Sequence, residues 1–408
     1  MNNLPANWEL KKLGKIITAL ENGNRPKGGV NQISAGIPSI GGEHLNSKGG
    51  FDFENIRYIQ KEFYDSMNRG KIKKKDILIV KDGATTGKVS FVNDDFPYEE
   101  CAVNEHVFIV RADTNKVVPK YLFYILFSNL GQSQIMKTFH GSAIGGINSK
   151  FVDSVSIPLF PLPIQRKIVS ILERAEKLKN LRQEANDETN TIIQALFYEM
   201  FGDPVKNEKR WQTASLIDHL EILGGFAFKS KDFVSGGIPL IKIGTVNKGY
   251  FDTSGISFLP YQYLTEYNKY TVSYGDILIS LTGTIGKDDY GNICVCDDKT
   301  NKYLLNQRVA KLIPKKTLNS KYLMFVFKNR DIKYKLTKLS RGIRQANISN
   351  KDILSVVMSI PPISLQNQFA SLVEKIESIK ENQTQSTEEI NTLFDALMQK
   401  AFQGELIA

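Results

Sequence analysis

The sequence predicts an α+β protein in which two similar globules are separated by an antiparallel coiled coil of two long helices, with pseudo-two-fold symmetry. Three observations support this fold class. The 408-residue chain is too long for one ordinary core. Its two halves match each other at an offset of about 200 residues. Each half begins with short strand-like runs and ends in a long glycine-free segment with heptad spacing.

The duplication extends through most of each half. A period this long indicates duplicated domains rather than a solenoid. The matching segments, first copy against second, are 36–38 and 237–239, 76–79 and 276–279, 104–107 and 306–309, 120–122 and 321–323, and 164–165 and 365–366.

In both globules, β-branched and aromatic runs broken by Gly, Asn and Asp predict a largely antiparallel sheet. Helical spacing of apolar residues appears late in each, at 120–129 and 321–338. Proline-rich joints then precede the two long segments. We therefore predict four parts: a first globule at 1–160, a first helix at 161–202, a second globule at 203–360 and a second helix at 361–408.

The two long segments carry an alternating four-three spacing of apolar residues that is typical of a coiled-coil seam. The predicted seam and subunit-interaction residues are Ile164, Ile168, Ile171, Leu178, Ile192 and Leu196 in the first helix, and Leu365, Phe369, Leu372, Ile376, Ile390, Leu393 and Leu397 in the second. About 36 residues give a rod of roughly 54 Å. If the seams pair, connectivity makes the helices antiparallel and the molecule a dumbbell. The alternative is that each helix packs on its own globule.

The basic excess lies in the globules. The chain has 53 Lys and Arg against 43 Asp and Glu, a net charge of +10. The net charge is +4 in residues 1–160, zero in 161–202, +10 in 203–360 and −4 in 361–408. If DNA is the partner, the globules rather than the helices are expected to bind it.

A basic run in the second globule points to nucleic acid. Seven Lys and Arg residues lie within seventeen positions of 328–344, against Asp331 alone. Lys333, Lys335 and Lys338 are predicted to contact phosphate, and the loop residues Arg341, Arg344 and Gln345 to contact base edges. The alternative is a solvated helix face. The first globule has His140 and Ser142 in the corresponding, less charged loop, so the two globules are expected to read different sequences.

A second paired feature is a Gly, Thr and Lys loop at 81–88 and 282–287. A Walker phosphate loop is excluded, because three or two residues rather than four separate the glycines and no Ser or Thr follows the lysine. A hairpin that presents Thr and Lys to DNA fits better, and a plain tight turn is the alternative. The predicted DNA contacts here, with one further lysine, are Lys81, Thr85, Thr86, Lys88, Thr282, Thr284, Lys287 and Lys242.

Signs of catalysis are missing from the sequence. It has no amino-methyltransferase motif, Gly-x-Gly cofactor loop or nuclease cluster, so no catalytic residue is predicted. The three cysteines and four scattered histidines argue against disulfides and against a metal site. No stretch is long and apolar enough for a membrane span, and no signal peptide is visible, which predicts a cytoplasmic protein.

Trp8 and Trp211 open the two globules, and Ile-Pro-Leu-Phe-Pro-Leu-Pro-Ile-Gln-Arg at 157–166 precedes the first helix. The second helix follows a less faithful version, with Ser364 where the first has Pro163. With the duplication and the two long helices, these motifs make the whole chain resemble the DNA-specificity subunits of type I restriction-modification systems. The resemblance implies that the globules at 1–160 and 203–360 are target-recognition domains.

The resemblance implies a non-catalytic subunit that reads a bipartite, asymmetric target in double-stranded DNA. It implies two modification (methyltransferase) subunits and added restriction (translocase and nuclease) subunits as partners. It also implies that S-adenosylmethionine and ATP lie on those partners and that no cofactor lies on this chain. A stand-alone DNA-binding regulator or scaffold, or an enzyme in its own right, is the alternative.

Overall fold

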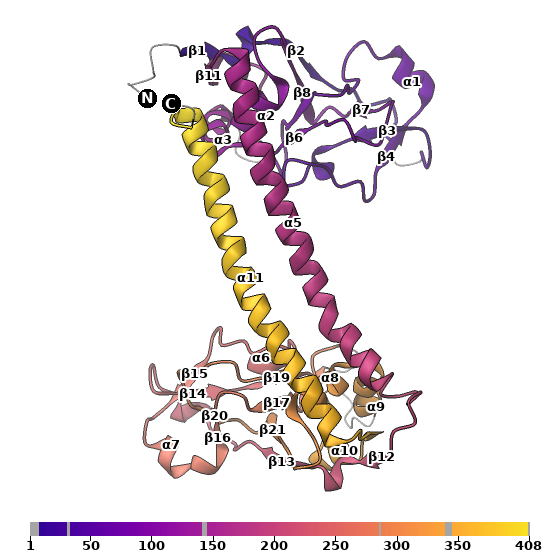
Figure 1. The fold of residues 1–408 in the computed structure, drawn as a ribbon, viewed down its shortest axis with the longest axis vertical. Helices are drawn as coiled ribbons and strands as arrows, with labels where there is room; N and C mark the ends of the chain where they lie inside the picture. Colours follow the sequence, from indigo (N-terminus) through magenta and orange to yellow (C-terminus); the bar gives the residue numbers. More distant parts are fainter. Residues whose placement is uncertain (1–7, 31–32, 141–144, 285–286, 339–344, 407–408) are drawn as a thin grey trace. The chain divides into compact units, whose positions relative to one another are not determined.

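The computed structural model describes residues 8–30, 33–140, 145–284, 287–338 and 345–406. The chain forms two compact units. Unit 1 comprises Met1–Gln183 and Gln385–Ala408, and unit 2 comprises Glu184–Thr384. Two long helices, α5 (Leu162–Phe201) and α11 (Ile363–Gln403), each contribute one half to each unit (Figure 1).

In unit 1 the sheets are small and mostly antiparallel. In the described residues their strand orders are β2-β8-β5-β6, β4-β3-β7, β1-β11 and β10-β9, and β3 pairs with β7 in parallel. The elements before α5 are β1 (Glu9–Lys12), η1 (Leu13–Lys15), β2 (Ile17–Asn22), β3 (Ile37–Ile40), η2 (Gly42–His44), β4 (Arg57–Ile59), α1 (Lys61–Ser66), β5 (Ile77–Val80), β6 (Val89–Phe91), β7 (Ala102–Val103), β8 (Val107–Ala112), α2 (Pro119–Phe127), α3 (Asn129–Met136), β9 (Phe139–His140), β10 (Gly146–Ile147), α4 (Phe151–Ser154) and β11 (Ser156–Leu159).

Unit 2 repeats this plan. Its strand orders are β13-β21-β17-β19, β15-β14-β20-β16, β12-β23 and β18-β22, and β14 pairs with β20 in parallel. The elements between the long helices are β12 (Thr213–Ser215), η3 (Leu216–Asp218), β13 (Leu220–Gly224), η4 (Ser230–Asp232), β14 (Ile238–Ile241), α6 (Ile243–Val246), β15 (Ser257–Leu259), α7 (Tyr263–Glu266), η5 (Asn268–Tyr270), β16 (Thr271–Val272), β17 (Ile277–Ser280), β18 (Thr282–Thr284), β19 (Ile293–Val295), β20 (Tyr303–Leu305), β21 (Val309–Pro314), α8 (Ser320–Lys328), α9 (Arg330–Lys338), β22 (Gln345–Asn347), α10 (Asn350–Leu354) and β23 (Val357–Ser359).

The central strands β5 and β17 are apolar on both faces because each lies between two cores. Side chains alternate along a strand. Ile77 and Ile79 therefore enter the core that also contains α2 and part of α5, whereas Leu78 and Val80 enter a second core of unit 1. In unit 2, Ile277 likewise packs with α8. The repeated Asp-Ile-Leu-Ile run of the sequence thus marks a strand buried on both sides.

The repeated Gly-Ile-Pro segment begins β3 and β14, and its glycine is required by the backbone. Gly36 and Gly237 have φ values of 148° and 153°. A Cβ atom would lie 2.5 Å from the carbonyl oxygen of Ile59 at the first site and 2.1 Å from that of Leu259 at the second. Any larger residue would force apart the antiparallel pairs β3-β4 and β14-β15.

Two helices occur late in each repeat. The predicted segment 120–129 corresponds to α2 alone, and 321–338, predicted as one run, forms α8 and α9. Both breaks have a polar cap. At the first, the Ser128 hydroxyl accepts a hydrogen bond from the Gly131 N–H. At the second, the Asn329 side chain accepts hydrogen bonds from the N–H groups of Asp331 and Ile332. A side chain that caps the next helix in this way ends the preceding one.

A buried glutamine fixes the start of each long helix. The Gln165 carbonyl oxygen accepts a hydrogen bond of 2.8 Å from the Val118 N–H, and its amide donates to the carbonyl oxygens of Phe160 and Lys116. Gln366 makes the equivalent three bonds in unit 2, accepting from Asn319 and donating to Pro361 and Thr317. Ser364 in place of Pro163 therefore leaves the helix start unchanged.

The halves of α5 and α11 pack together in antiparallel fashion within each unit. In unit 1, Leu172 of α5 shares a core with Phe394 and Phe402 near the end of α11. In unit 2, Phe197 near the end of α5 packs against Phe369 at the start of α11, with ring centroids 5.7 Å apart. The Gln383 amide also donates to the Thr189 hydroxyl at 3.0 Å.

The packed face of both helices drifts from the strict heptad of the predicted seam. Most predicted seam residues are buried or half-buried, but Leu178, Ile192 and Leu393 are 47%, 46% and 49% exposed. Neighbours such as Ile193 and Phe394 are buried instead. An α-helix with 3.6 residues per turn rotates about 20° per heptad against a 3.5-residue repeat, which explains the drift.

Candidate nucleic-acid interface

In unit 1, the Gly, Thr and Lys loop is a turn between β5 and β6 whose polar side chains are bonded to the fold. The Thr85 hydroxyl donates to the Gly42 carbonyl, and that of Thr86 donates to Gly83. The Lys88 ammonium donates to the Leu45 carbonyl at 3.2 Å, and Lys81 lies 3.4 Å from the Asp82 carboxylate. All four predicted DNA contacts therefore lie together in this loop, and each has an internal partner.

In unit 2 the corresponding residues are spread further apart. Thr282 and Thr284 lie on β18, where Thr282 is 9% exposed and Thr284 is exposed. Lys287 is exposed beyond that strand. Lys242 lies at the start of α6, where its ammonium donates to the Ser257 hydroxyl at 2.7 Å and lies over the Phe233 ring.

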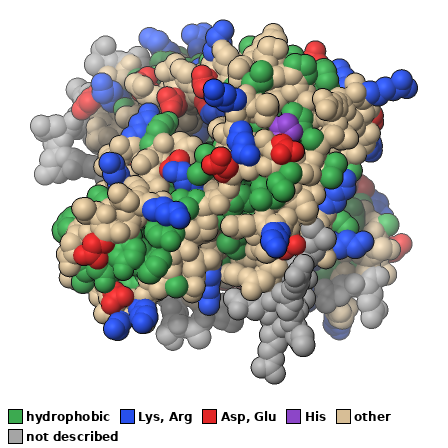
Figure 2. All heavy atoms as spheres, turned by 90° about the horizontal axis from the view of Figure 1, so that it is seen from below, with side chains coloured by type: hydrophobic (Ala, Val, Ile, Leu, Met, Phe, Trp, Pro, Cys, Tyr) green, Lys and Arg blue, Asp and Glu red, His purple; other side chains and the backbone are tan. Residues whose placement is uncertain are grey.

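The basic helix α9 presents two kinds of lysine. The Lys333 ammonium forms an ion pair with the Asp288 carboxylate and donates to the Asn292 side chain, so its positive charge is largely neutralised within unit 2. Lys335 and Lys338 are exposed. The helix borders a groove of about 780 Å³, to which it contributes Arg330 and which is also lined by Lys287 and Lys328. On the face shown in Figure 2, Lys and Arg side chains are interspersed with Asp and Glu.

Several predicted base readers lie outside the described residues. These are Ser142, Arg341 and Arg344. The backbones of His140 and Gln345 are described, in β9 and β22, but their side chains are not. Strand β22 pairs with β18, with Gln345 opposite Thr284, so the end of the basic segment lies beside the predicted hairpin contacts.

A charged cluster in unit 1 was missed by the sequence reasoning. His106 lies against the Asp82 carboxylate through Nδ1, and its Nε2 lies 3.4 Å from the Glu105 carboxylate. Glu105 also lies 3.7 Å from the Arg25 guanidinium. A small cavity of about 50 Å³ beside them is lined by Arg25, Glu105, His106 and Arg57, among others. The available signal was the difference between Glu105-His106 and Gln307-Arg308 inside the matching segments 104–107 and 306–309.

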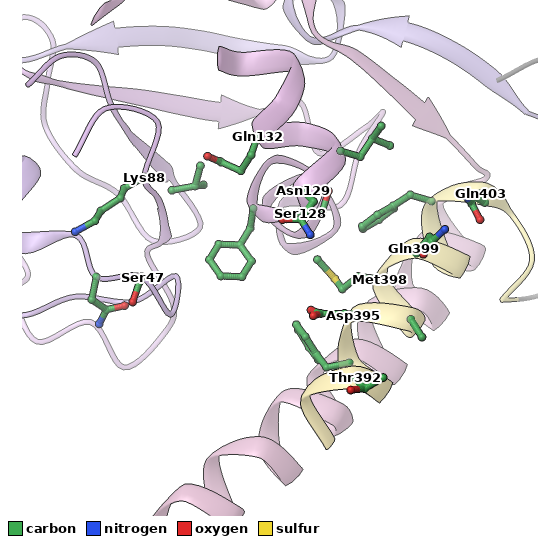
Figure 3. A pocket seen from close by; sticks show the side chains of 17 residues that line it. Ser47, Lys88, Ser128, Asn129, Gln132, Thr392, Asp395, Met398, Gln399 and Gln403 are labelled. Carbon is green, nitrogen blue, oxygen red and sulfur yellow. The ribbon is translucent and has the colours of Figure 1, made fainter. Parts of the chain in front are cut away.

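Each unit also has a cleft beside the helix pair. The cleft of unit 1 has a volume of about 890 Å³, and that of unit 2 about 680 Å³. Figure 3 shows how the first is lined by Ser47, Lys88, Ser128, Asn129 and Gln132 from the globule, and by Thr392, Asp395, Met398, Gln399 and Gln403 from α11 and its end. In unit 2 the end of α5, with Ile193 and Phe197, takes the place of α11.

The cysteines offer no reactive thiol. Burial raises the pKa of Cys101 well above its usual value, that of Cys294 to about 12 and that of Cys296 to about 11. No group of His, Cys, Asp and Glu suited to a metal ion occurs in the described part of the chain. Within the same residues, no helix has both the length and the apolar composition of a bilayer span.

Comparisons with known proteins agree on one family. A family profile described as "Type I restriction modification DNA specificity domain" matches residues 5–190 and again residues 208–392. The type I restriction enzyme MjaVIII specificity subunit of Methanocaldococcus jannaschii is 24% identical, with 99% of this chain and 94% of the relative covered. The EcoKI specificity subunit of Escherichia coli is 23% identical over 99% of this chain and 90% of that protein.

Solved structures share the fold. The specificity subunit from Thermoanaerobacter tengcongensis matches with a TM-score of 0.50 and 20% identity, over 99% of this chain and 98% of that one. The specificity subunit from M. genitalium matches with a TM-score of 0.54 and 15% identity, over 98% and 97%. A chain from a study of complex assembly and conformational transition of a type I restriction-modification system matches over both full lengths, with a TM-score of 0.64 and 20% identity.

Proposed function

The chain belongs to the type I restriction-modification DNA-specificity family and is the non-catalytic specificity subunit of such a system, and from this premise we propose how its parts divide the work. The recognition domains at 1–160 and 203–360 each read one half of a bipartite, asymmetric target in double-stranded DNA. The helices at 161–202 and 361–408 set the unspecified spacer between the halves. The family carries no cofactor, because S-adenosylmethionine and ATP are bound by the modification and restriction subunits.

This proposal rests mainly on the finding that the two units share the same backbone fold but carry different side chains on their exposed loops. Equivalent strands, buried glutamines and helix starts recur in both units. By contrast, the exposed loops carry different side chains. Two readers with one framework and unequal loops are expected to recognise unequal half-sites.

The partners we propose are two copies of a modification subunit, with restriction subunits added to that complex. Two copies of the modification subunit are supported by the two equivalent clefts. The cleft of unit 1 is bounded by the globule with α2 and by the end of α11, and that of unit 2 by the globule with α8 and by the end of α5. Equivalent ion pairs also accompany them: Lys120 pairs with Glu176 in unit 1, and Lys321 pairs with Glu377 in unit 2. A partner that binds one DNA reader is then expected to bind the other. A target in cellular DNA places the complex in the cytoplasm.

The test is to express the chain with its modification subunits in a host that lacks methylation and to sequence the methylated bases. We expect a single asymmetric motif with two specified halves and unspecified bases between them, and a complex with two modification subunits per chain by mass measurement. A continuous or symmetric motif would contradict the bipartite reading. DNA binding without any copurifying modification subunit would favour a stand-alone regulator.

A further inference from the structure

The charged cluster of unit 1 lies at a position that has an exact counterpart in unit 2. The same backbone hydrogen bonds hold the chain at both positions. The Lys81 N–H donates to the His106 carbonyl at 2.8 Å, and the Leu281 N–H donates to the Arg308 carbonyl at 3.0 Å. The Lys81 carbonyl accepts from Ile147, as the Leu281 carbonyl accepts from Ile348.

The neighbouring bonds match as well. The Asn104 N–H donates to Ile40, and the Asn306 N–H donates to Ile241. Asp82 forms a β-bridge with Gly146, and Thr282 pairs with Asn347. Two residues at the end of β5 or β17 and three before β8 or β21 are therefore placed alike in both units.

The side chains at these matched positions differ completely in charge. Unit 1 has Asp82, Glu105 and His106. Unit 2 has Thr282, Gln307 and Arg308. Gln307 and Arg308 are exposed, and Arg308 forms no ion pair with any residue that the structure describes. The framework is constant, whereas two carboxylates are replaced by neutral groups and a histidine by an arginine, which only donates. Such a change is what two different base readers require.

The two carboxylates of the unit 1 cluster have neighbours that allow them to approach DNA. A free carboxylate would be repelled by phosphates. Here the Lys81 ammonium lies near Asp82 and the Arg25 guanidinium near Glu105, so each carboxylate has a cation beside it, and the His106 ring contacts both carboxylates. Their side chains are 22% and 30% exposed, which leaves acceptor oxygens accessible while the ion pairs limit their freedom. Carboxylates in this state can accept from the exocyclic amino group of a base.

We propose that Asp82, Glu105 and His106 determine base specificity in the first half-site, and that the exposed Gln307 and Arg308 do so in the second, beside the buried Thr282. This inference rests on the proposed function, in which each unit reads one half. The acidic set accepts hydrogen bonds from the amino group of cytosine or adenine. Arg308 donates to guanine in the major groove, where the Arg fork matches O6 and N7.

The experiment exchanges the two sets within the full complex. The triple variant D82T/E105Q/H106R places the side chains of unit 2 in unit 1, and T282D/Q307E/R308H makes the reverse exchange. E99Q, which removes a charge from an exposed position of unit 1, is the matched control. Each chain is expressed with its modification subunits, and the readouts are the methylated motif and competition binding at fixed salt to duplexes altered in one half-site.

We expect the first variant to change or relax one or more positions of the first half only, with discrimination there altered by about 5- to 100-fold. The reverse exchange should alter the second half only, and E99Q neither. An unchanged motif with unchanged discrimination in a folded triple variant would overturn the inference while leaving the bipartite motif, and so the proposed function, intact.

The single variants E105Q and R308H keep the test decisive if a triple variant does not fold. Wild-type discrimination in both single variants would also overturn the inference. A wild-type complex without a two-part motif would instead overturn the proposed function itself.

Discussion

Replacing Gln165 by Leu should remove the bonds that fix the first turn of α5 to the recognition domain. The variant leaves the Val118 N–H without its acceptor and two carbonyl oxygens without a donor in a site where Gln165 is fully buried. One orphaned buried amide costs about 1–3 kcal/mol, and the two weakened carbonyls add to it, so we expect about 2–4 kcal/mol of local destabilisation. Gln366→Leu should have an equal effect in unit 2, through Asn319.

Hydrogen exchange measured by mass spectrometry can separate these two effects. Protection of peptides covering 116–122 should fall by about 30- to 700-fold in Gln165→Leu if exchange follows local opening, while peptides covering 317–323 remain protected. Gln366→Leu should reverse that pattern, and the double variant should show both losses because the sites share no partner. Gln368→Leu, an exposed change on α11, is the control. Protection at 116–122 in Gln165→Leu equal to that in the control would refute the reasoning.

Two further predictions concern DNA. Lys335→Ala should weaken binding to specific and random duplexes alike, and should reduce the slope of log K against log salt by about 0.9. Lys333→Ala should change that slope less, because the Lys333 charge is paired with Asp288. Equal slopes for the two variants would contradict the structural distinction. Arg344→Ala, at a predicted base reader, should instead cost about 1–3 kcal/mol on the specific site and relax one position, and equal losses on random DNA would count against it. Seven residues inserted after Ala185 and seven after Ser386 should lengthen each helix by about 10 Å, which corresponds to about 3 base pairs of DNA at about 3.4 Å each, so the unspecified spacer should grow by that amount. An unchanged spacer in an active complex would contradict this role of the helices.

Features set by local chemistry could be predicted from the sequence. The run at 76–79 and its copy at 276–279 form buried central strands. The proline-rich segments that lead into 164–165 and 365–366 are each followed by a long helix, as predicted. The heptad spacing also located the helix pairs. It did not locate the packed face, because the accumulated rotation of a 3.6-residue helix places Ile193 rather than Ile192 inward.

The candidate site was less accessible to sequence reasoning, since the state of a lysine depends on partners far along the chain. Lys333 and Asp288 are 45 residues apart in the sequence, and nothing local distinguishes Lys333 from the exposed Lys335. His106 and Asp82 meet only because β5 and β8 are neighbours in the sheet. In the sequence His106 is one of four scattered histidines, and only the fold brings it into a charged cluster at a position that the two units fill differently.

The claim that two separate readers act in one chain is tested most directly by exchanging one of them. Residues 1–155 are replaced by the first recognition domain of another specificity subunit, the chimaera is expressed with the modification subunits, and the methylated bases are sequenced. The predicted result is a motif with a new first half and the original second half. A motif changed in both halves, from a folded and active complex, would contradict the account.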